Sequence, residues 1–429
     1  MKILERNYHD INNALISLIA ITLIFRKVNT VLILFFAIFN ILYINKLNFN
    51  KKKLYFILII TSPLLLNLLF IFNNDSLLYG FKATEKYFSL LVFSVVIIGQ
   101  KRRINLDQLF SYYSKGTALI LVVLFFRYIV LFNDNFLKYL SGKHLWEMGY
   151  NFANSFGAHA PALNLHMAFV SIVSLYLLLK SNKDKGLKKA FHLVTFFISF
   201  GVVLYVNTRV SIIMSLVGFC IIFIYFVKNS TFIHLTVKRL ILYAAIIIVG
   251  AFLFTQAFPF TVKKFTNVTF SNMDMVGRLD EFENPEKKIF NSLVTRLTIW
   301  QSAYELSKES AWIGFGASDS KTALNNYYKK SDQKFLYKYK FPVHNQFLDF
   351  LLKFGILGLL VVFIYILSMG FLGIQLRHPI PIIFCVLFFV SNITDDFLIS
   401  YSGIVFSGFW FSIFANCYLN HDSKQQLEI

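Results

Sequence analysis

The chain has 429 residues, of which 57% are hydrophobic, and its mean hydropathy is +0.61. This composition excludes an ordinary soluble protein, because apolar runs long enough to cross a bilayer, roughly 17–25 residues, recur along the chain. The net charge of +20 comes from 42 basic and 22 acidic residues, but the basic residues lie in short connections between apolar runs. That arrangement indicates the orientation of a membrane protein rather than binding of nucleic acid.

The apolar runs predict an all-α integral membrane protein with about 12 transmembrane helices and one large periplasmic loop. Connections such as "KLNFNKKK" and "QKRR" are richer in Lys and Arg than the short outer ones, which predicts that both termini are cytoplasmic. The first run ends in "FRKVNT" without a small-residue cleavage site, so we expect an anchor rather than a removed signal peptide. The predicted spans lie near 11–25, 28–44, 54–73, 82–99, 116–133, 161–180, 191–206, 210–227, 240–257, 346–368, 379–394 and 402–419.

These spans divide the chain into three expected parts. Residues 1–257 hold transmembrane helices one to nine, residues 258–345 form the periplasmic loop, and residues 346–429 hold helices ten to twelve with a short cytoplasmic C-terminus. The three cysteines lie inside apolar runs without metal-ligand spacing, so we interpret them as structural.

The large loop is predicted to contain a helix of its own. The stretch "SLVTRLTIWQSAYELSKES" (292–310) reads as an amphipathic helix that ends at the glycine-punctuated turn "GFGAS". A loop of this length with its own helix is typical of a functional loop. Its apolar stripe is expected to consist of Leu293, Leu297, Trp300, Ala303 and either Tyr304 or Leu306.

Two arginines are candidates for anion binding. Arg209, in "LYVNTRVSIIMSL", is predicted to begin a membrane helix at the outer face, where free N–H groups and the helix dipole favour an anion. Its guanidinium suits a phosphate, although an arginine that only snorkels to the interface would give the same pattern. Arg296 lies in the first turn of the loop helix, where a cation opposes the dipole. It is therefore either functional or an ordinary solvated arginine.

His344 stands at the start of the apolar run "FPVHNQFLDFLLKFGILGLL" (341–360). Read as one helix, this run places His344, Leu348, Leu351 and Gly355 on a shared face. Gly358 falls close to that face too, so another helix could approach its lower half closely. An imidazole can accept a proton near neutral pH as a general base, or it can simply cap the helix. In this topology His344 and both arginines lie on the outer face, so a base would stand beside two anion-binding groups.

Other charged residues are weaker candidates. Asp395 and Asp396, in "TDDF", follow the eleventh span and could orient an imidazole or an arginine, or form a solvated pair. Arg127 lies inside the fifth span, where a charge is a functional hypothesis by default. The sequence has no D-x-D motif, no Gly-rich phosphate loop and no His/Cys metal cluster, which disfavours a nucleotide-sugar or metal-dependent transferase. Further candidates for phosphate binding are Lys82, Lys86, His159 and His166.

Three segments together resemble the O-antigen ligase family. "VHNQFLDFLLKFGILG" is similar to that family's His-Asn motif and the helix after it, "NTRVSIIMSLVGF" to its arginine at the start of a span, and "TRLTIWQSAYELSKESAWIGFG" to its loop helix. The segments occur in the family's order, and the resemblance covers roughly residues 190–400. The family includes ligases that attach O-antigen to the lipid A core and related polysaccharide polymerases.

The resemblance implies a GT-C-like, inverting glycosyltransferase that needs neither metal nor cofactor. It would transfer a glycan from undecaprenyl diphosphate to lipid A–core at the periplasmic face of the bacterial inner membrane, in lipopolysaccharide biosynthesis. The implied catalytic residues are His344 as the base, with Arg209 and Arg296 on the diphosphate. The expected partners are the two glycolipids and membrane lipids, without nucleic acid. Further substrate-binding residues are expected to be Asn345, Asp395, Asp396 and Arg127.

Two alternatives stay open at this stage. A polymerase would use nearly the same donor chemistry but would join one lipid-linked repeat unit to another. A flippase or transporter would fit twelve spans and a basic lumen, but such proteins often contain internal repeats and a site near the midplane of the membrane. No repeat is detected in the sequence, and the candidate site lies at the outer surface, so a transporter is the less favoured alternative.

Overall fold

A computed structural model describes residues 2–181, 186–229, 256, 259–260, 271–289 and 292–420 of the chain. Throughout these residues the regular elements are helices, and the β-type pairing is one isolated bridge between Leu47 and Gln100. The prediction of an all-α protein is therefore confirmed for the described part of the chain. Seven of its helices are long and apolar enough to cross a membrane. They are α3 (Lys51–Leu69), α6 (Leu106–Leu131), α9 (Ala160–Lys180), α10 (Leu187–Val206), α11 (Arg209–Asn229), α18 (Gln346–Gln375) and α20 (Tyr401–Leu419).

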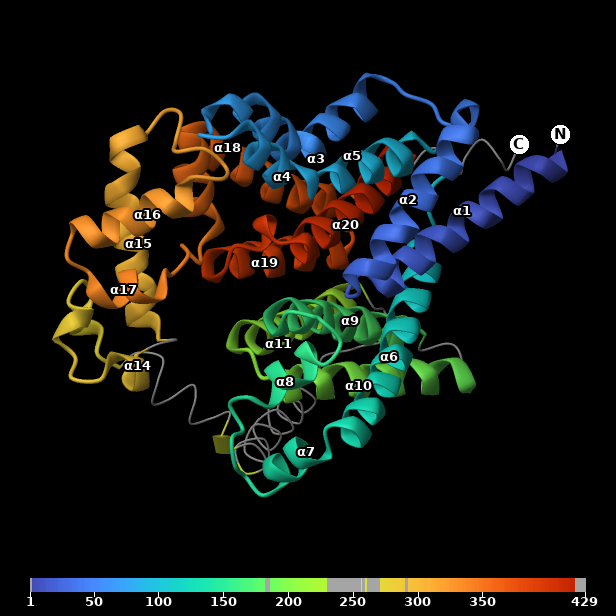
Figure 1. The fold of residues 1–429 in the computed structure, drawn as a ribbon. Coiled ribbons are helices and arrows are strands. Elements are labelled where there is room, and N and C mark those ends of the chain that lie inside the picture. The colour runs from blue at the N-terminus through green and yellow to red at the C-terminus, as the bar shows by residue number, and fades with distance from the viewer. Residues whose placement is uncertain are drawn as a thin grey trace.

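The helices follow one another with short connections (Figure 1). Up to the large loop they are α1 (Lys2–Thr22), α2 (Arg26–Leu42), α3 (Lys51–Leu69), α4 (Leu77–Glu85), α5 (Phe88–Phe93), the π-helical η3 (Ser94–Ile98), α6 (Leu106–Leu131), α7 (Asn133–Leu140), α8 (Met148–Asn154), α9 (Ala160–Lys180), α10 (Leu187–Val206) and α11 (Arg209–Asn229). The rest are α14 (Pro285–Lys288), α15 (Leu293–Ser307), α16 (Ser320–Lys330), α17 (Lys334–Tyr339), α18 (Gln346–Gln375), α19 (Pro379–Thr394), the 3-10 turn η8 (Phe397–Ile399) and α20 (Tyr401–Leu419).

The predicted spans fall on helices, except that the span at 240–257 lies outside the described residues. Four of the predicted spans do not lie on a helix that is by itself long and apolar enough to cross a membrane: α2 has 17 residues and α19 has 16, α1 begins with charged residues, and 82–99 is divided among α4, α5 and η3. The structure thus supports a multi-pass protein with fewer full-length spanning helices than twelve among the described residues.

The basic connections gather at one end of the bundle. The buried Lys53 ammonium donates a hydrogen bond to the carbonyl of Gln100 (2.9 Å), and the amide of Ile104 donates to the side chain of Asn416 (3.0 Å). These bonds join "KLNFNKKK", "QKRR" and the end of α20. The loop helices α15, α16 and α17 lie at the other end (Figure 1). This separation of basic connections from the loop is the arrangement that the charge pattern predicts.

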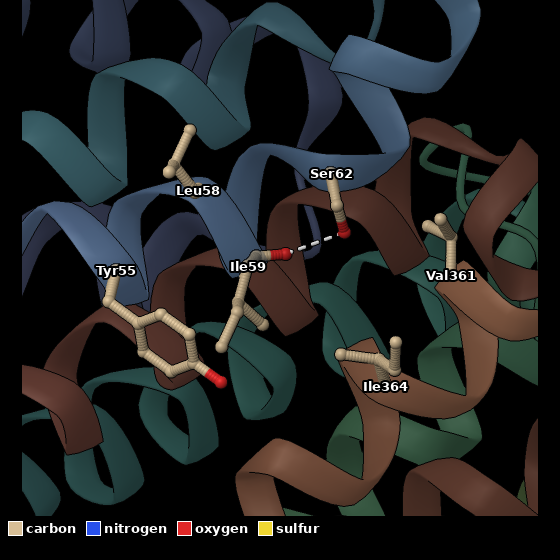
Figure 2. A pocket seen from close by; sticks show the side chains of 6 residues that line it. All are labelled: Tyr55, Leu58, Ile59, Ser62, Val361 and Ile364. Carbon is tan, nitrogen blue, oxygen red and sulfur yellow. Dashed lines mark hydrogen bonds between the residues drawn. The ribbon is translucent and has the colours of Figure 1, made fainter.

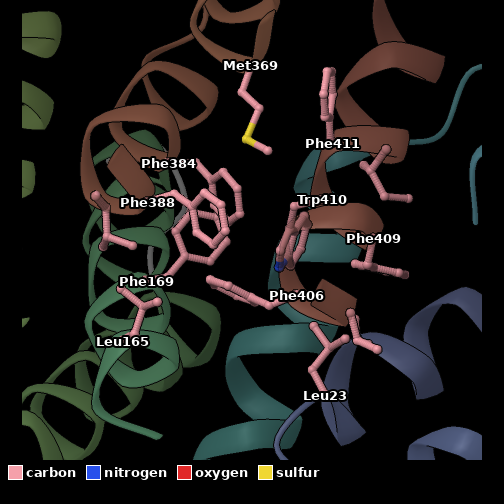
Figure 3. Close-up of a cluster of buried hydrophobic side chains, with 14 of the residues drawn as sticks. Leu23, Leu165, Phe169, Met369, Phe384, Phe388, Phe406, Phe409, Trp410 and Phe411 are labelled. Carbon is pink, nitrogen blue, oxygen red and sulfur yellow. The ribbon is translucent and has the colours of Figure 1, made fainter. Parts of the chain in front are cut away.

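The centre of the bundle is packed with aromatic rings. In both α9 and α20, 83% of the apolar stretch is buried, so these two helices form its middle. Trp410 of α20 lies with its ring centroid 5.2 Å from that of Phe169 in α9, and Phe384 of α19 lies 5.0 Å from Phe169 (Figure 3). Edge-to-face packing of this kind adds to the stabilisation from burial alone.

The loop helices have a separate, smaller core. Val294, Ile299 and Ala303 of α15 are fully buried. They pack with residues of α16 and α17 and with Leu352 of α18, so the loop is a folded unit that rests on the bundle through α18. The complete set of buried residues is Leu279, Ile289, Val294, Ile299, Ala303, Leu306, Leu324, Tyr328, Phe335, Leu336, Phe341, Val343 and Leu352.

Helix α18 is interrupted at Gly355, which has φ 63° and ψ −155°. This conformation is essentially restricted to glycine. A Cβ atom at Gly355 would also collide with the backbone of Trp312, so the loop turn lies directly against the interruption. The amide of Ile356, which cannot form a helical bond there, donates to the carbonyl of Ala311 at 2.8 Å. The segment that approaches α18 closely at Gly355 is therefore a loop turn rather than the helix that was predicted for this face.

The same turn satisfies two carbonyls on the other side of the interruption. The amide of Phe315 donates to the carbonyl of Leu352 (2.7 Å), and the amide of Gly316 donates to the carbonyl of Lys353 (3.0 Å). Gly314 has φ +68° and packs its Cα against the backbone of Lys353. Backbone groups that a broken membrane helix leaves free are tolerated where other protein groups satisfy them. The "GFGAS" turn performs this role for α18.

Candidate functional site

His344 lies at the junction between the loop and α18. It precedes the helix, which begins at Gln346, and its backbone is left-handed with φ 51°. The side chain is 32% exposed, and its Nδ1 lies 3.4 Å from Oδ1 of Asp395. The prediction that His344 shares a helical face with Leu348 is wrong, because the helix starts two residues later and a left-handed residue points its side chain elsewhere.

Asn345 supplies the N-cap that starts α18. Its side-chain oxygen accepts hydrogen bonds from the amides of Phe347 (3.0 Å) and Leu348 (3.1 Å), and the residue is 8% exposed. Capping satisfies amides that the first helical turn leaves free. Asn345, expected to bind substrate, therefore has a structural task here, which is to fix the residue before it.

Asp395 and Asp396 follow α19, and their pKa values are shifted in opposite directions. Burial disfavours the Asp395 carboxylate, but hydrogen bonds with His344 and Asp396 outweigh burial and hold the pKa of Asp395 below its usual range. Burial, the hydrogen bond to Asp395 and the charge of Asp349 raise the pKa of Asp396 well above its usual range. These opposite shifts favour the ionised form of Asp395, the carboxyl group that faces His344, and the protonated form of Asp396.

Arg296 connects the loop helix to the same place. The helix begins with Ser292 as its N-cap, whose side chain accepts from the amide of Thr295 at 3.3 Å. One guanidinium nitrogen of Arg296 donates to the carbonyl of Thr394, the last residue of α19. This bond places Arg296 next to Asp395 in the fold and fixes the loop helix to the bundle.

The buried face of α15 differs from the predicted stripe. Ala303 and Leu306 are buried as expected, whereas Tyr304 is 54% exposed. The difference arises because small polar residues of the helix are buried instead. Thr298 accepts from the amide of Gly277 (3.0 Å), so its hydroxyl can be buried at low cost. The residues that the structure buries are Val294, Thr295, Thr298, Ile299, Ser302, Ala303, Leu306 and Ser307.

Arg209 begins α11, as predicted. The chain reverses just before it, with Asn207 in the left-handed conformation. The buried Asn164 of α9 holds this turn by donating to the hydroxyl of Thr208 at 2.7 Å and to the carbonyl of Val203 at 3.3 Å. Arg209 interacts electrostatically with Arg296 and with a tyrosine of α8.

That tyrosine, Tyr150, was not identified from the sequence. Burial raises its pKa, and its electrostatic partners are Arg296, Asp395 and Arg209. It therefore links both arginines with the acidic pair. Helix α8 has seven residues without an apolar pattern, so no sequence signal placed Tyr150 near the other candidates.

His159, a minor candidate, joins the site from the N-cap position of α9. Burial lowers its pKa, and Asp395 and His344 are its charged neighbours. The structure thus surrounds His344 with groups from α19 and α9 as well as from the loop.

Of the remaining candidates, Lys86 has Asp396 among its charged neighbours, and the other three lie elsewhere. Arg127 is exposed near the end of α6 and donates to the carbonyl of Ser155 (3.2 Å), so it ties α6 to α8 rather than carrying a buried charge. Lys86 donates to the carbonyl of Ile399. His166 is buried against Phe406, with ring centroids 3.9 Å apart, and belongs to the aromatic core. Lys82 lies over the ring of Tyr79.

The geometry around His344 would also accommodate a cation. One donor atom from each of His344, Asp395 and Asp396 lies within 4.8 Å of the other two. Imidazole and carboxylate groups are ligands that several divalent metals accept. The sequence-based expectation of a metal-independent site is therefore a prediction that needs its own experiment.

A shallow groove of about 210 Å³ lies well away from these residues. It runs between α3 and α18 and is mostly apolar (Figure 2). It has two hydroxyls, on Tyr55 and Ser62, and that of Ser62 donates to the carbonyl of Ile59 at 2.7 Å. Its lining contains no histidine, carboxyl or amine side chain. Its lining residues are Tyr55, Leu58, Ile59, Ser62, Val361 and Ile364.

Comparison with known families adds an independent observation. Residues 194–363 match the model of the family Wzy_C, described as O-Antigen ligase. The matched segment begins in α10 and ends in α18, and it includes Arg209, Arg296 and His344. No curated protein matches the chain. Over residues 194–363, the chain is therefore similar to the O-antigen ligase family.

Proposed function

We propose that the protein is an O-antigen ligase. It transfers a glycan from undecaprenyl diphosphate to a sugar hydroxyl of lipid A–core, at the periplasmic face of the bacterial inner membrane. The family assignment supports a glycosyltransferase-like reaction on lipid-linked glycans. The observation that carries the proposal is the contact between His344 and ionised Asp395 beside Arg296, at the junction of loop and bundle.

In this reaction His344 is the general base. Asp395 accepts a hydrogen bond from Nδ1–H, which leaves Nε2 with a free lone pair for the proton of the acceptor hydroxyl. Removal of that proton lets the hydroxyl oxygen form its bond to the anomeric carbon. Asp396 keeps its proton and supports the Asp395 carboxylate, while Asn345 holds His344 through the helix cap.

The arginines act on the donor. As the bond between the anomeric carbon and the diphosphate breaks, both electrons go to the diphosphate, and Arg209 and Arg296 stabilise the charge that develops there. The diphosphate is a good leaving group without a metal. The acceptor attacks from the opposite face and inverts the anomeric carbon. Tyr150, which interacts electrostatically with both arginines and with Asp395, would donate its hydroxyl to the same phosphate oxygens.

The family assignment also covers polymerases, so the acceptor must be tested directly. The experiment is deletion of the gene, complementation with wild type or variants, and gel analysis of lipopolysaccharide. For a ligase, deletion removes every band above core while lipid-linked polymer accumulates. Bands of core plus one repeat unit would identify a polymerase instead.

Complementation with His344→Ala is expected to fail at normal protein abundance. The matched control is His144→Ala, because His144 is a half-exposed histidine in the connection between α7 and α8. Restoration of the full band pattern by His344→Ala would remove the histidine from the mechanism.

A further inference from the structure

A group of large apolar residues is exposed at the outer end of α3 and on the loop turn. Trp312 is 79% exposed, Phe72 is 81%, Leu69 is 68% and Ile313 is 56%. Large apolar residues that gather in one place mark an interaction surface more often than single exposed ones do. We call these four residues the outer apolar patch.

The patch is held together by backbone contacts. The side chain of Asn73 donates to the carbonyls of Ile313 (2.9 Å) and Gly314 (3.2 Å), which joins the end of α3 to the turn. Trp312 is fixed in turn against Gly355 of α18. The exposed side chains therefore project from a rigid junction of α3, α18 and the turn.

The position of this junction along α18 is informative. The first part of the helix is largely buried and contains the polar residues Gln346, Asp349 and Lys353, the last two of which form an ion pair at 2.6 Å. After Gly355 the helix becomes apolar, and its outward residues Leu360, Ile364 and Leu367 are 50%, 53% and 57% exposed. Residues 355–375 are long enough to cross about 30 Å of hydrocarbon at 1.5 Å per residue. The hydrocarbon region therefore begins at the level of Gly355.

We propose that the outer apolar patch binds the outer-leaflet surface of the lipid bilayer and anchors the loop turn to it. The patch is continuous with the lipid-facing sides of α3 and α18, and it lies at the depth where hydrocarbon meets headgroups. Tryptophan is enriched at this depth because its ring is apolar and its N–H is polar. The anchor fixes the height of α15, and of Arg296 on it, relative to the membrane surface.

The test measures the depth of Trp312 in nanodiscs that contain the full chain. The chain has four tryptophans, so the emission of Trp312 is obtained as the difference between wild type and Trp312→Phe. Lipids with bromine at shallow or deep acyl positions act as membrane quenchers, and iodide acts as the aqueous quencher. The same difference is measured in a Trp146→Phe background, which removes another exposed tryptophan and controls for effects of substitution alone.

We expect shallow bromine to quench most of the Trp312 emission, deep bromine to quench less, and iodide to quench little. Efficient quenching by iodide without quenching by bromolipids would place the turn in water and overturn the proposal. It would leave the patch as a surface for a protein partner. Stronger quenching by deep than by shallow bromine would place Trp312 deeper in the hydrocarbon and would overturn the proposal that it lies at the level of the headgroups.

Discussion

The aromatic core of the bundle and the junction between loop and bundle are built in opposite ways. The core consists of many interlocking rings, such as Phe169, which contacts Phe384, Phe406 and Trp410. The junction depends on a few polar contacts, among them those of His344 and Arg296, with no redundancy. This difference teaches that stability and chemistry are located in separate regions, so substitutions should separate the two properties.

The largest separation is expected for His344→Ala. Loss of a general base costs about 10²–10⁴ in rate, which is about 2.7–5.4 kcal/mol of transition-state stabilisation. The side chain is partly exposed, and its Nδ1 lies 3.4 Å from Asp395, which is a long contact, so thermal stability should stay near that of wild type. Transfer assays with purified protein, normalised to folded protein, measure the rate, and a thermal unfolding assay measures stability. A large fall in both the transfer rate and the thermal stability would contradict the separation of chemistry from stability.

Phe169→Ala should show the reverse behaviour. Truncation of a fully buried phenylalanine typically costs about 3–5 kcal/mol of unfolding free energy, and Phe169 is 0% exposed. The surviving folded protein should transfer glycan at the wild-type rate. Phe197→Ala is the matched control, because Phe197 is 63% exposed on α10 and its truncation leaves no cavity. Equal unfolding temperatures for both variants would contradict the assignment of stability to the core.

Arg209→Lys and Arg296→Lys test the junction with the charge retained. A lysine keeps the attraction to a diphosphate but loses the planar two-point contact, and loss of one hydrogen bond to a charged group is expected to reduce transfer about 10- to 100-fold. The loss should be milder for Arg296. Arg278→Lys is the control, because Arg278 is a half-exposed loop arginine paired with Glu281. Wild-type transfer rates for both site variants would show that the arginines contribute only their positive charge and not a planar two-point contact.

The smallest effect is expected from chelation. If the junction works through His344 and the arginines alone, EDTA should leave transfer unchanged. Loss of transfer that magnesium, manganese or zinc restores would show that His344, Asp395 and Asp396 hold a cation.

The sequence was sufficient where one physical signal acts along the chain. Hydropathy located the helices, and the "SLVTRLTIWQSAYELSKES" segment predicted α15 with Arg296 near its start. It failed where the outcome depends on contacts between distant segments. Tyr150 and His159 join the site only because α8 and α9 fold against the outer ends of other helices. His344 was placed on a helical face because a left-handed residue leaves no periodic signal.

The interruption of α18 at Gly355 also determines which segments can be exchanged between relatives. The turn at 311–316 donates to two carbonyls before the interruption and accepts from one amide after it, and Gly314 and Gly355 each lie against the backbone of the opposite segment. A chimera that replaces the loop but keeps residues 352–356 would pair a turn with a break it does not fit. The unit of exchange is therefore the loop together with the outer third of α18, and domain boundaries drawn at the membrane surface would cut through it.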